Sequence, residues 1–179
     1  GVDFFEHHYI KGETLGRGHF AKVKLVKHKT SAQFAAAKIL DKRLDEHSAD
    51  AELLIRETEI LASLQHPHIV RLYEAFDTPH TIILVCELAS GGELMHRIAE
   101  ADGLYTELEA RRHCWSLMDA VSFMHSRSIV HRDLKPENVR LSDRTPEARL
   151  LIADFGLGRF ISHEAATMET VCGTHDYLA

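Results

Sequence analysis

The alternation of hydrophobic and polar positions divides the chain into a first part rich in strands and a second part rich in helices. Three short segments of β type, separated by turns, come first: "YIKGETLGRG" (9–18), "AKVKLVKHKT" (21–30) and "FAAAKIL" (34–40). In "AKVKLV", charged and apolar residues alternate, which is typical of a half-buried antiparallel strand. "IVRLYEAF" (69–76) and "TIILVCEL" (81–88) predict two more strands.

Two longer segments follow the helical period instead. Residues 51–67 place Leu54, Leu61 and Leu64 on one stripe, and Pro67 closes the segment. Residues 105–128 predict a second helix, which opens with a capping box of Thr106 and Glu109. This second helix carries apolar residues at three- and four-residue spacing: Cys114, Leu117, Val121 and Met124.

The pattern changes at the glycine pair 91–92, so we expect an α+β fold with two lobes. The predicted parts are a β-rich lobe with one main helix (1–86), a connecting segment (87–92) and a mostly helical lobe (93–179). Ligands favour clefts between such lobes.

Composition narrows the class of protein. The 179 residues are 45% hydrophobic and 27% charged, as in an ordinary soluble globular protein. The net charge of −6 argues against nucleic acid as the main partner. The longest apolar run is too short to span a bilayer, and no signal segment opens the chain. We therefore expect no membrane association and a cytoplasmic location, with the nucleus as the alternative.

The three cysteines, Cys86, Cys114 and Cys172, are far apart and odd in number. This distribution favours a reducing compartment and buried free thiols.

Gly16 and Gly18 lie in a turn between two predicted strands. That position argues against a dinucleotide-binding fold, whose glycines open a helix. A glycine-rich hairpin lets backbone amides approach phosphates closely. Such turns are common, so this motif alone is a weak signal.

Lys38 ends an apolar strand, where a lysine needs an anion or a route to solvent. Glu57 lies on the core-facing stripe of the first helix, between Leu54 and Leu61. The two residues can therefore form a buried ion pair. The alternative is that both are surface residues.

One loop, "HRDLKPEN" (131–138), holds Asp133, Lys135 and Asn138, and Asp154 follows an apolar strand. A proton-accepting acid, a lysine and two oxygen ligands suited to Mg²⁺ are the components of a phosphoryl-transfer site. Any one of them alone would indicate only a surface turn.

The order of the motifs resembles that of eukaryotic protein kinases. "GRGHFAKV", "AAAK", "RETEIL", "HRDLKPEN", "ADFG" and "CGT" occur in that family's order, from about residue 5 to the last residue. "LKPEN" resembles the Ser/Thr kinases. "LVCEL", "ASGGEL" and "SIVHRDL" resemble the calcium/calmodulin-dependent group, in particular kinase I and the phosphorylase kinase catalytic subunit.

The resemblance implies a bilobal fold that is truncated in its C-terminal lobe. It also implies an enzyme that uses Mg²⁺ and transfers the γ-phosphoryl group of ATP to a Ser or Thr hydroxyl of a protein. The alternative is a pseudokinase that binds or scaffolds. By motif position, Lys38 would hold the phosphates and pair with Glu57, Asp133 would accept the hydroxyl proton, and Lys135 would steady the transferring group. Asn138 and Asp154 would bind the metal. The expected nucleotide contacts are Leu15, Gly16, Gly18, Val23, Ala36, Lys38, Glu87, Ala89, Glu93 and Arg140, with Cys86 as the gatekeeper.

Several positions depart from the family pattern, among them Ala21, His175 and Asp176. The most consequential is Arg140, which stands where an apolar side chain normally floors the adenine site. Its stem could contact the base, its guanidinium could stack on the base, or it could be an unpaired buried charge that blocks the site. We expect ATP binding to be weakened by about tenfold and not abolished.

Partners also follow from the resemblance. Glu93 and Glu137 match positions that read arginines, so substrates with basic residues near the Ser or Thr are expected. Calmodulin would bind through a segment beyond the given chain. Thr170, whose phosphate could pair with Arg132, is the expected activating phosphosite, with Thr167 as the alternative.

Overall fold

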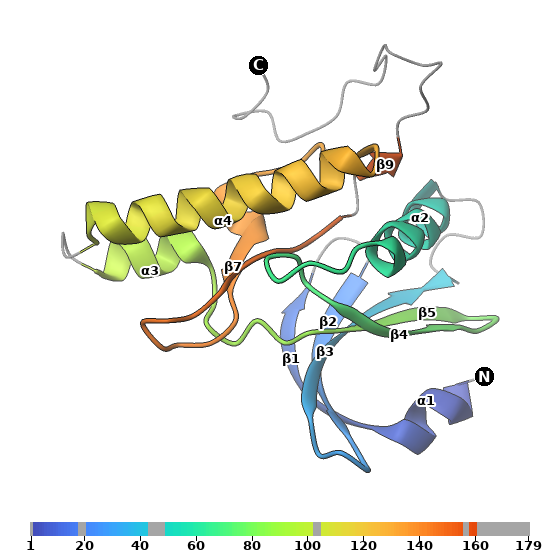
Figure 1. Ribbon diagram of the computed structural model, residues 1–179. Helices are drawn as coiled ribbons and strands as arrows, with labels where there is room; N and C mark the ends of the chain where they lie inside the picture. The colour runs from blue at the N-terminus through green and yellow to red at the C-terminus, as the bar shows by residue number, and fades with distance from the viewer. Residues whose placement is uncertain (1, 18–20, 43–48, 102–104, 156–157, 161–179) are drawn as a thin grey trace. The chain divides into compact units, whose positions relative to one another are not determined.

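The computed structural model describes residues 2–17, 21–42, 49–101, 105–155 and 158–160 (Figure 1). The chain divides into two units, Gly1–Thr58 with Arg71–Leu88, and Glu59–Val70 with Ala89–Ala179. The boundaries expected at residues 86 and 92 stay a prediction. The second unit differs from them by including residues 59–70.

The first unit is built on a five-stranded antiparallel sheet. Its strands are β1 (Tyr9–Arg17), β2 (Ala21–His28), β3 (Phe34–Asp41), β4 (Leu72–Asp77) and β5 (Thr81–Cys86), in the order β1-β2-β3-β5-β4. Helices α1 (Val2–His8) and α2 (Ala49–Ser63) lie on opposite sides of the sheet (Figure 1). All five strands and α2 coincide with segments that the sequence predicted.

The register of β3 and β5 sorts their side chains between the two faces of the sheet. Ala37 pairs with Val85, and both belong to a buried cluster around Phe5 of α1. Leu40 pairs with Ile82, and both belong to a second cluster with Leu84. Because side chains alternate along a strand, Lys38 projects to the same face as Leu40.

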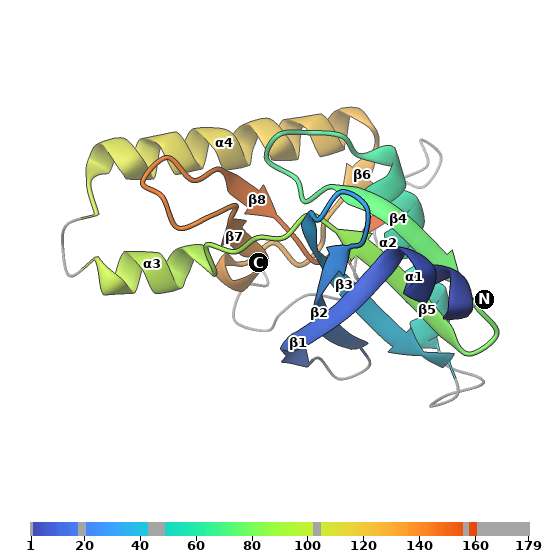
Figure 2. The ribbon, with the colours of Figure 1, turned by 90° about the horizontal axis from the view of Figure 1, so that it is seen from below.

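Helix α1 was not predicted, because seven residues are too few for a clear period. Tertiary packing holds it in place: Phe5 is fully buried and its ring stacks on Tyr9 and meets Phe76 edge-on. Figure 2 looks onto this face of the sheet.

The second unit combines two helices with short strand pairs. Its elements are α3 (Leu94–Glu100), α4 (Glu107–Ser126), β6 (Ile129–Val130), the 3-10 turn η2 (Pro136–Asn138), β7 (Val139–Leu141), β8 (Leu150–Ile152) and β9 (Arg159–Phe160). Strands β6 and β9 form one antiparallel pair and β7 and β8 form another. The β7–β8 pair lies between α3 and α4 (Figure 2), with β7 contacting α3 and β8 contacting α4.

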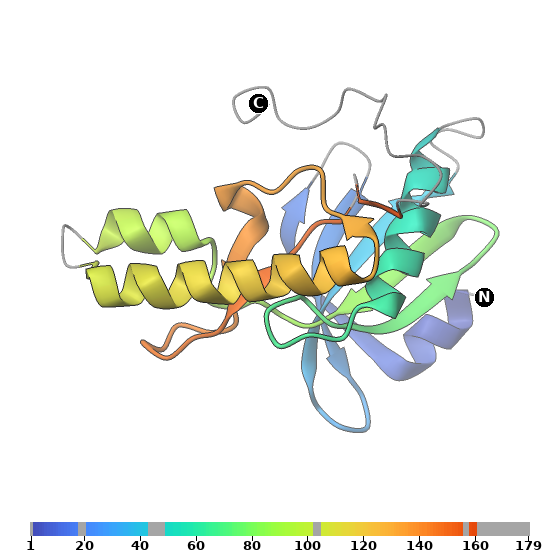
Figure 3. The same cartoon turned by 45° about the horizontal axis from the view of Figure 1, so that its top comes forward.

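Helix α4, drawn in yellow and orange in Figure 3, begins with the predicted capping box. Thr106 Oγ1 accepts from the N–H of Glu109, and the Glu109 carboxylate accepts from the N–H of Thr106. The buried positions, however, are His113, Ser116, Ala120 and Met124. Of the apolar positions that the sequence places at helical spacing, Met124 is buried, Leu117 and Val121 are half-buried and Cys114 is exposed, so small and polar side chains supply most of the buried face.

The cysteine prediction was also wrong in part. Cys114 is exposed, since it lies outside the buried stripe of α4, and Cys86 is partly buried. Cys172 lies outside the described residues. Among the helices that the structure describes, none combines the length and the apolar character needed to cross a membrane.

Candidate active site

The first unit holds the expected lysine–glutamate pair. Lys38 Nζ of β3 lies 2.9 Å from Glu57 Oε1 and 2.7 Å from Oε2, so both carboxylate oxygens accept from the same ammonium group. The Glu57 side chain is only 3% exposed, whereas that of Lys38 is 25% exposed. The alternative in which both are surface residues is therefore excluded. The ammonium group is fixed in position while its side chain still reaches solvent.

The expected nucleotide-contacting residues of the sheet surround Lys38. Val23 on β2 is paired with Lys38, and Ala36 lies two residues before it, paired with Cys86. Burial raises the pKa of the Cys86 thiol to about 12, so this side chain is a neutral, weakly polar group at neutral pH. Leu15 is exposed, and a Cβ added at Gly16 would meet nothing within 4 Å. Gly18 lies outside the described residues.

The segment after β5 is tied to the start of β4. Glu87 donates its N–H to the carbonyl of Arg71 (2.8 Å), and its carboxylate accepts from the N–H of Arg71 (3.4 Å). These bonds fix the backbone where a nucleotide base was expected to bind. Ala89, the other expected contact of the base, is half-buried in the second unit.

The second unit gathers Asp133, Lys135 and Asn138 in one loop. Lys135 Nζ lies 3.1 Å from Asp133 Oδ2. The Asn138 amide nitrogen donates to the Asp133 carbonyl (2.8 Å) and to Asp133 Oδ2 (3.2 Å). Pro136 starts the 3-10 turn that places Asn138 back toward Asp133. The carboxylate is therefore held from two sides, with its side chain 14% exposed.

His131 links this loop to the residue before Asp154. Its Nδ1 accepts from the N–H of Asp133 (3.3 Å), and its Nε2 lies 3.1 Å from the carbonyl of Ala153. The ring must therefore carry its proton on Nε2, which donates to that carbonyl. Burial lowers the pKa of His131, so the neutral ring that this arrangement requires persists at neutral pH. Sequence reasoning did not assign His131 this role.

Backbone hydrogen bonding brings the two expected metal ligands together. The N–H of Ala153 donates to the carbonyl of Asn138 (2.9 Å), and Val139 pairs with Ile152. Asn138 and Asp154 thus stand at the same end of the β7–β8 pair. Their amide and carboxylate oxygens suit Mg²⁺, and the Asn138 nitrogen is already committed to Asp133, which turns the amide oxygen the other way.

A metal ion bound here would need further ligands. Among the residues that the structure describes, no three His, Cys, Asp or Glu side chains are grouped to hold a metal. Phosphate oxygens would complete the coordination shell, which is the usual arrangement for Mg²⁺. The donor set therefore fits a metal that arrives with a phosphorylated substrate.

Two residues of this region adopt the left-handed backbone conformation. Arg132 has a φ of 63° and Asp154 a φ of 60°. For residues other than glycine this conformation costs about 1–3 kcal/mol, and it is concentrated at functional sites. The surrounding hydrogen bonds of His131 and Ala153 hold both residues in place.

Arg140 and Glu93, both expected at the nucleotide, contact each other. In β7, Val139 and Leu141 are buried and Arg140 projects to the other side, with 41% of its side chain exposed. Its Nη2 lies 3.4 Å from Glu93 Oε1. The alternative in which Arg140 is an unpaired buried charge is therefore wrong.

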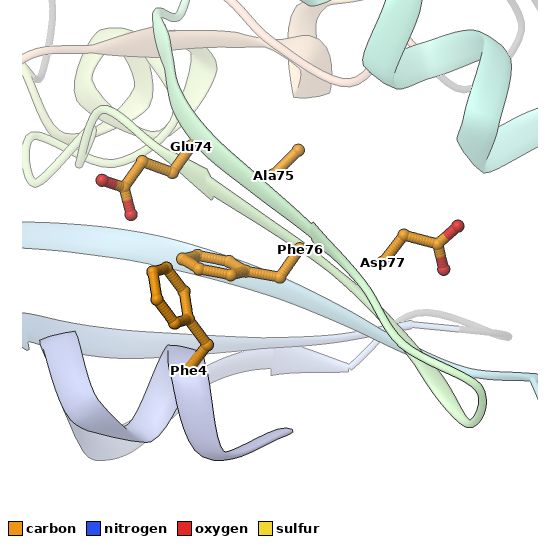
Figure 4. A pocket seen from close by; sticks show the side chains of 5 residues that line it. All are labelled: Phe4, Glu74, Ala75, Phe76 and Asp77. Carbon is orange, nitrogen blue, oxygen red and sulfur yellow. The ribbon is translucent and has the colours of Figure 1, made fainter. Parts of the chain in front are cut away.

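A surface hollow of about 480 Å³ lies on the first unit (Figure 4). Phe4 of α1 and Phe76 of β4 face each other there, with ring centroids 6.2 Å apart, beside Glu74, Ala75 and Asp77. Phe76 packs on the Phe5 side of the sheet, opposite to the face that carries Lys38. Within the first unit, the hollow is thus separate from the Lys38–Glu57 pair.

The remaining expectations fall outside the described residues. These are the phosphosites Thr170 and Thr167, the "CGT" motif, and the atypical His175 and Asp176.

Comparison with known proteins agrees with this set of residues. Residues 9–179 match the family described as protein kinase domain. Calcium/calmodulin-dependent protein kinase type IV of Mus musculus is 43% identical over 177 residues, which is 99% of this chain and 35% of that protein. Calcium/calmodulin-dependent protein kinase type 1 of Caenorhabditis briggsae is 40% identical over 93% of this chain and 46% of that protein.

The name of a third relative states the residues that it phosphorylates. Serine/threonine-protein kinase SIK2 of Gallus gallus is 40% identical over 93% of this chain, which covers 20% of that protein. The chain thus spans half or less of the length of these three relatives. The motif order, the Lys38–Glu57 pair and the loop around Asp133 all agree with the match: the chain belongs to the protein kinase family.

Proposed function

We propose that the protein containing this chain is a serine/threonine protein kinase that uses ATP and Mg²⁺. The observation that carries the proposal is the hydrogen-bonded loop of Asp133, Lys135 and Asn138, tied through His131 to the residue before Asp154. Relatives named as serine/threonine and calmodulin-dependent protein kinases support it.

The geometry suits Asp133 to the proton transfer. The substrate hydroxyl oxygen would form a bond to the γ-phosphorus as the bond from that phosphorus to the β-phosphate oxygen breaks. The hydroxyl proton passes to the Asp133 carboxylate, which Asn138 orients. Lys135, 3.1 Å from that carboxylate, is placed to offset negative charge on the transferring group.

The other residues bind and orient. Lys38, fixed by Glu57, would hold the nucleotide phosphates. Asn138 and Asp154 would hold Mg²⁺, which when bound supplies charge neutralisation to the phosphate oxygens. Leu15, Gly16, Gly18, Val23, Ala36, Glu87, Ala89, Glu93 and Arg140 would contact the rest of the nucleotide.

For the substrate, we propose proteins with basic residues near the acceptor Ser or Thr, recognised by the carboxylates of Glu93 and Glu137. Calmodulin is named in two of the relatives, and binding of calmodulin by a further segment of this protein is a proposal by that likeness. The pseudokinase alternative is disfavoured, since Lys38, Glu57, Asp133, Asn138 and Asp154 are all present and Arg140 is paired.

Replacement of Asp133 tests the proposal. In the complete protein, Asp133→Asn keeps the side-chain shape and removes the proton acceptor, so peptide phosphorylation should fall by about 10²–10⁴-fold. ATP binding should persist, because Lys38 and the metal ligands are intact. Glu100→Gln makes the same carboxylate-to-amide change on the exposed surface of α3 and should leave turnover at the wild-type level. Equal turnover by Asp133→Asn and wild type would refute the assignment.

A further inference from the structure

The Glu93–Arg140 pair is held together by backbone as well as by charge. The two residues form an antiparallel bridge, and the N–H of Leu141 donates to the carbonyl of Gly92 (3.0 Å). The N–H of Gly91 donates in turn to the carbonyl of Leu141 (3.0 Å). Directly opposed residues of such a bridge have neighbouring Cβ atoms, so the backbone already places the two side chains within contact distance.

The lack of a side chain at Gly91 lets this bridge form. A Cβ at Gly91 would lie 2.0 Å from the carbonyl oxygen of Asp143 and 2.7 Å from Leu141 Cβ. The segment before Glu93 is therefore pressed against β7 and the turn that follows it. This close approach fixes the position of Glu93 opposite Arg140.

Arg140 is the arginine directed at Glu93. Arg97, one helical turn after Glu93 on α3, donates instead to the carbonyl of Thr145 (2.8 Å). Arg140 Nη2 lies 3.4 Å from Glu93 Oε1, and both side chains are about two-fifths exposed. An ion pair at that exposure is weak enough to open and reform in solution.

The guanidinium group of Arg140, which contacts Glu93, is the same chemical group that a substrate arginine would bring to Glu93. We propose that Arg140 is a specificity-determining residue: it occupies the Glu93 carboxylate from within the chain and so weakens recognition of substrate arginine there. This inference rests on the proposed kinase function. It deepens that function by making Glu137, which is exposed, the main reader of basic substrate residues.

The consequence is a weaker preference for arginine at the substrate position that contacts Glu93. A substrate arginine must displace Arg140 before it reaches Glu93. The free energy gained when the substrate arginine pairs with Glu93 is therefore offset by the free energy lost when the Arg140–Glu93 pair breaks. Removing the Arg140 charge should leave Glu93 with an uncompensated carboxylate. Selectivity for arginine at the substrate position that contacts Glu93 should then rise.

The test uses the complete protein at saturating ATP, so that any effect of Arg140 on nucleotide binding does not enter the comparison. Serine peptides are compared in pairs that differ only by Arg or Ala at one upstream position, and the position is scanned. The measured quantity is the ratio of kcat/KM for the Arg peptide to that for the Ala peptide. The variants are Arg140→Leu, Glu93→Gln and the double variant, with Arg140→Gln in case the leucine disturbs β7.

At one upstream position, Arg140→Leu and Arg140→Gln should raise this ratio by about three- to tenfold, the scale of one ordinary hydrogen bond that stays partly exposed to solvent. The double variant should return to the wild-type ratio, since Glu93 is then absent. Arg144→Leu, which removes an exposed arginine from the turn after β7, should leave every ratio unchanged.

Two results would overturn the inference. One is an unchanged ratio at all positions in both Arg140 variants. The other is a loss of arginine selectivity in Glu93→Gln as large in the wild-type background as in Arg140→Leu, because Glu93 would then be fully available despite Arg140. If no peptide is phosphorylated, the proposed function fails instead, and the affinities of the same peptide pairs, measured by fluorescence anisotropy, still decide the inference.

Discussion

At the scale of single residues, a charged side chain of the site is stabilised by the groups that it contacts. Lys38 stands in an apolar strand, and Glu57 is buried on α2. Each would be unfavourable alone, and together they satisfy each other. By the same reasoning, Arg140 is not an unpaired buried charge, because its partner is Glu93.

The Lys38–Glu57 pair should therefore show strong coupling. Glu57→Gln keeps the shape and removes the charge, and we expect it to lower the free energy of unfolding by about 1–3 kcal/mol. This is less than for a fully buried pair, because Lys38 remains in contact with solvent. Lys38→Met in the Glu57→Gln background should restore part of the loss. Urea unfolding of the wild type, the two single variants and the double variant measures the coupling, and simple additivity would contradict it.

At the scale of elements, close backbone contacts and hydrogen bonds of buried or partly buried histidines hold the second unit together. Gly91 allows the segment before α3 to touch the β7–β8 turn. His66, in the loop after α2, joins that loop to α4: its Nδ1 accepts from the N–H of His68, and its Nε2 lies 3.2 Å from Asp119 Oδ2. This pattern requires the neutral ring with its proton on Nε2, donating to the Asp119 carboxylate.

Gly91→Ala should disrupt the first of these contacts. Backbone atoms stand in the way of the added methyl group, so we expect a loss of about 3 kcal/mol, at the upper end of the overpacking range. Gly16→Ala adds the same group where nothing lies within 4 Å and should change stability by less than about 0.5 kcal/mol. Thermal unfolding of the two variants compares them directly. Equal melting temperatures would show that the 90–93 segment moves aside freely.

The histidines predict acid sensitivity. Burial lowers the pKa of His66, His113 and His131. Because the unfolded chain then binds protons more readily than the folded one, the stability that these residues contribute is complete above the unfolded value near 6.5. It is lost as the pH falls below that value. Urea midpoints between pH 8 and pH 5 should decrease toward acid.

A variant isolates the contribution of His66. In His66→Gln the amide can still donate to Asp119 but does not titrate, so the midpoint should depend less steeply on pH than in wild type. His80→Gln, which changes an exposed histidine of the first unit, should retain the wild-type slope. A wild-type slope in His66→Gln would remove His66 from the explanation.

At the scale of the whole molecule, the two units carry different parts of the proposed chemistry. The first holds the Lys38–Glu57 pair, and the second holds Asp133, Lys135, Asn138 and Asp154. The second unit also leaves large apolar side chains exposed on α4, namely Leu108, Trp115 and Met118, each about two-thirds exposed or more. Their spacing places them on one side of the helix.

That side of α4 should drive self-association of a protein made of residues 1–179 alone, because contiguous exposed apolar surface promotes association in water. The combined variant Trp115→Arg and Met118→Lys should be largely monomeric. Phe34→Lys, which changes an exposed aromatic residue of the first unit, should behave as wild type does. Sedimentation velocity at several concentrations distinguishes them. A monomeric wild type would contradict the prediction.

The sequence by itself determined the features that depend on neighbours along the chain. The strand at "AKVKLV", the helix that holds Glu57 and the capping box at Thr106 all depend on residues a few positions apart, and all three elements are present in the structure. The order of the motifs likewise indicated the family. These rules are local, so a single sequence suffices to read them.

Only the tertiary structure decided the rest. The stripe of α4 that is buried depends on what packs against it, and α1 exists because Phe5 enters a cluster formed by distant strands. Arg132 and Asp154 adopt left-handed backbone where their neighbours His131 and Ala153 are hydrogen-bonded to each other across two segments. Arg140 and Glu93 are 47 positions apart in the chain. Their pairing, on which the proposed substrate preference rests, is set by the bridge that the fold creates between them.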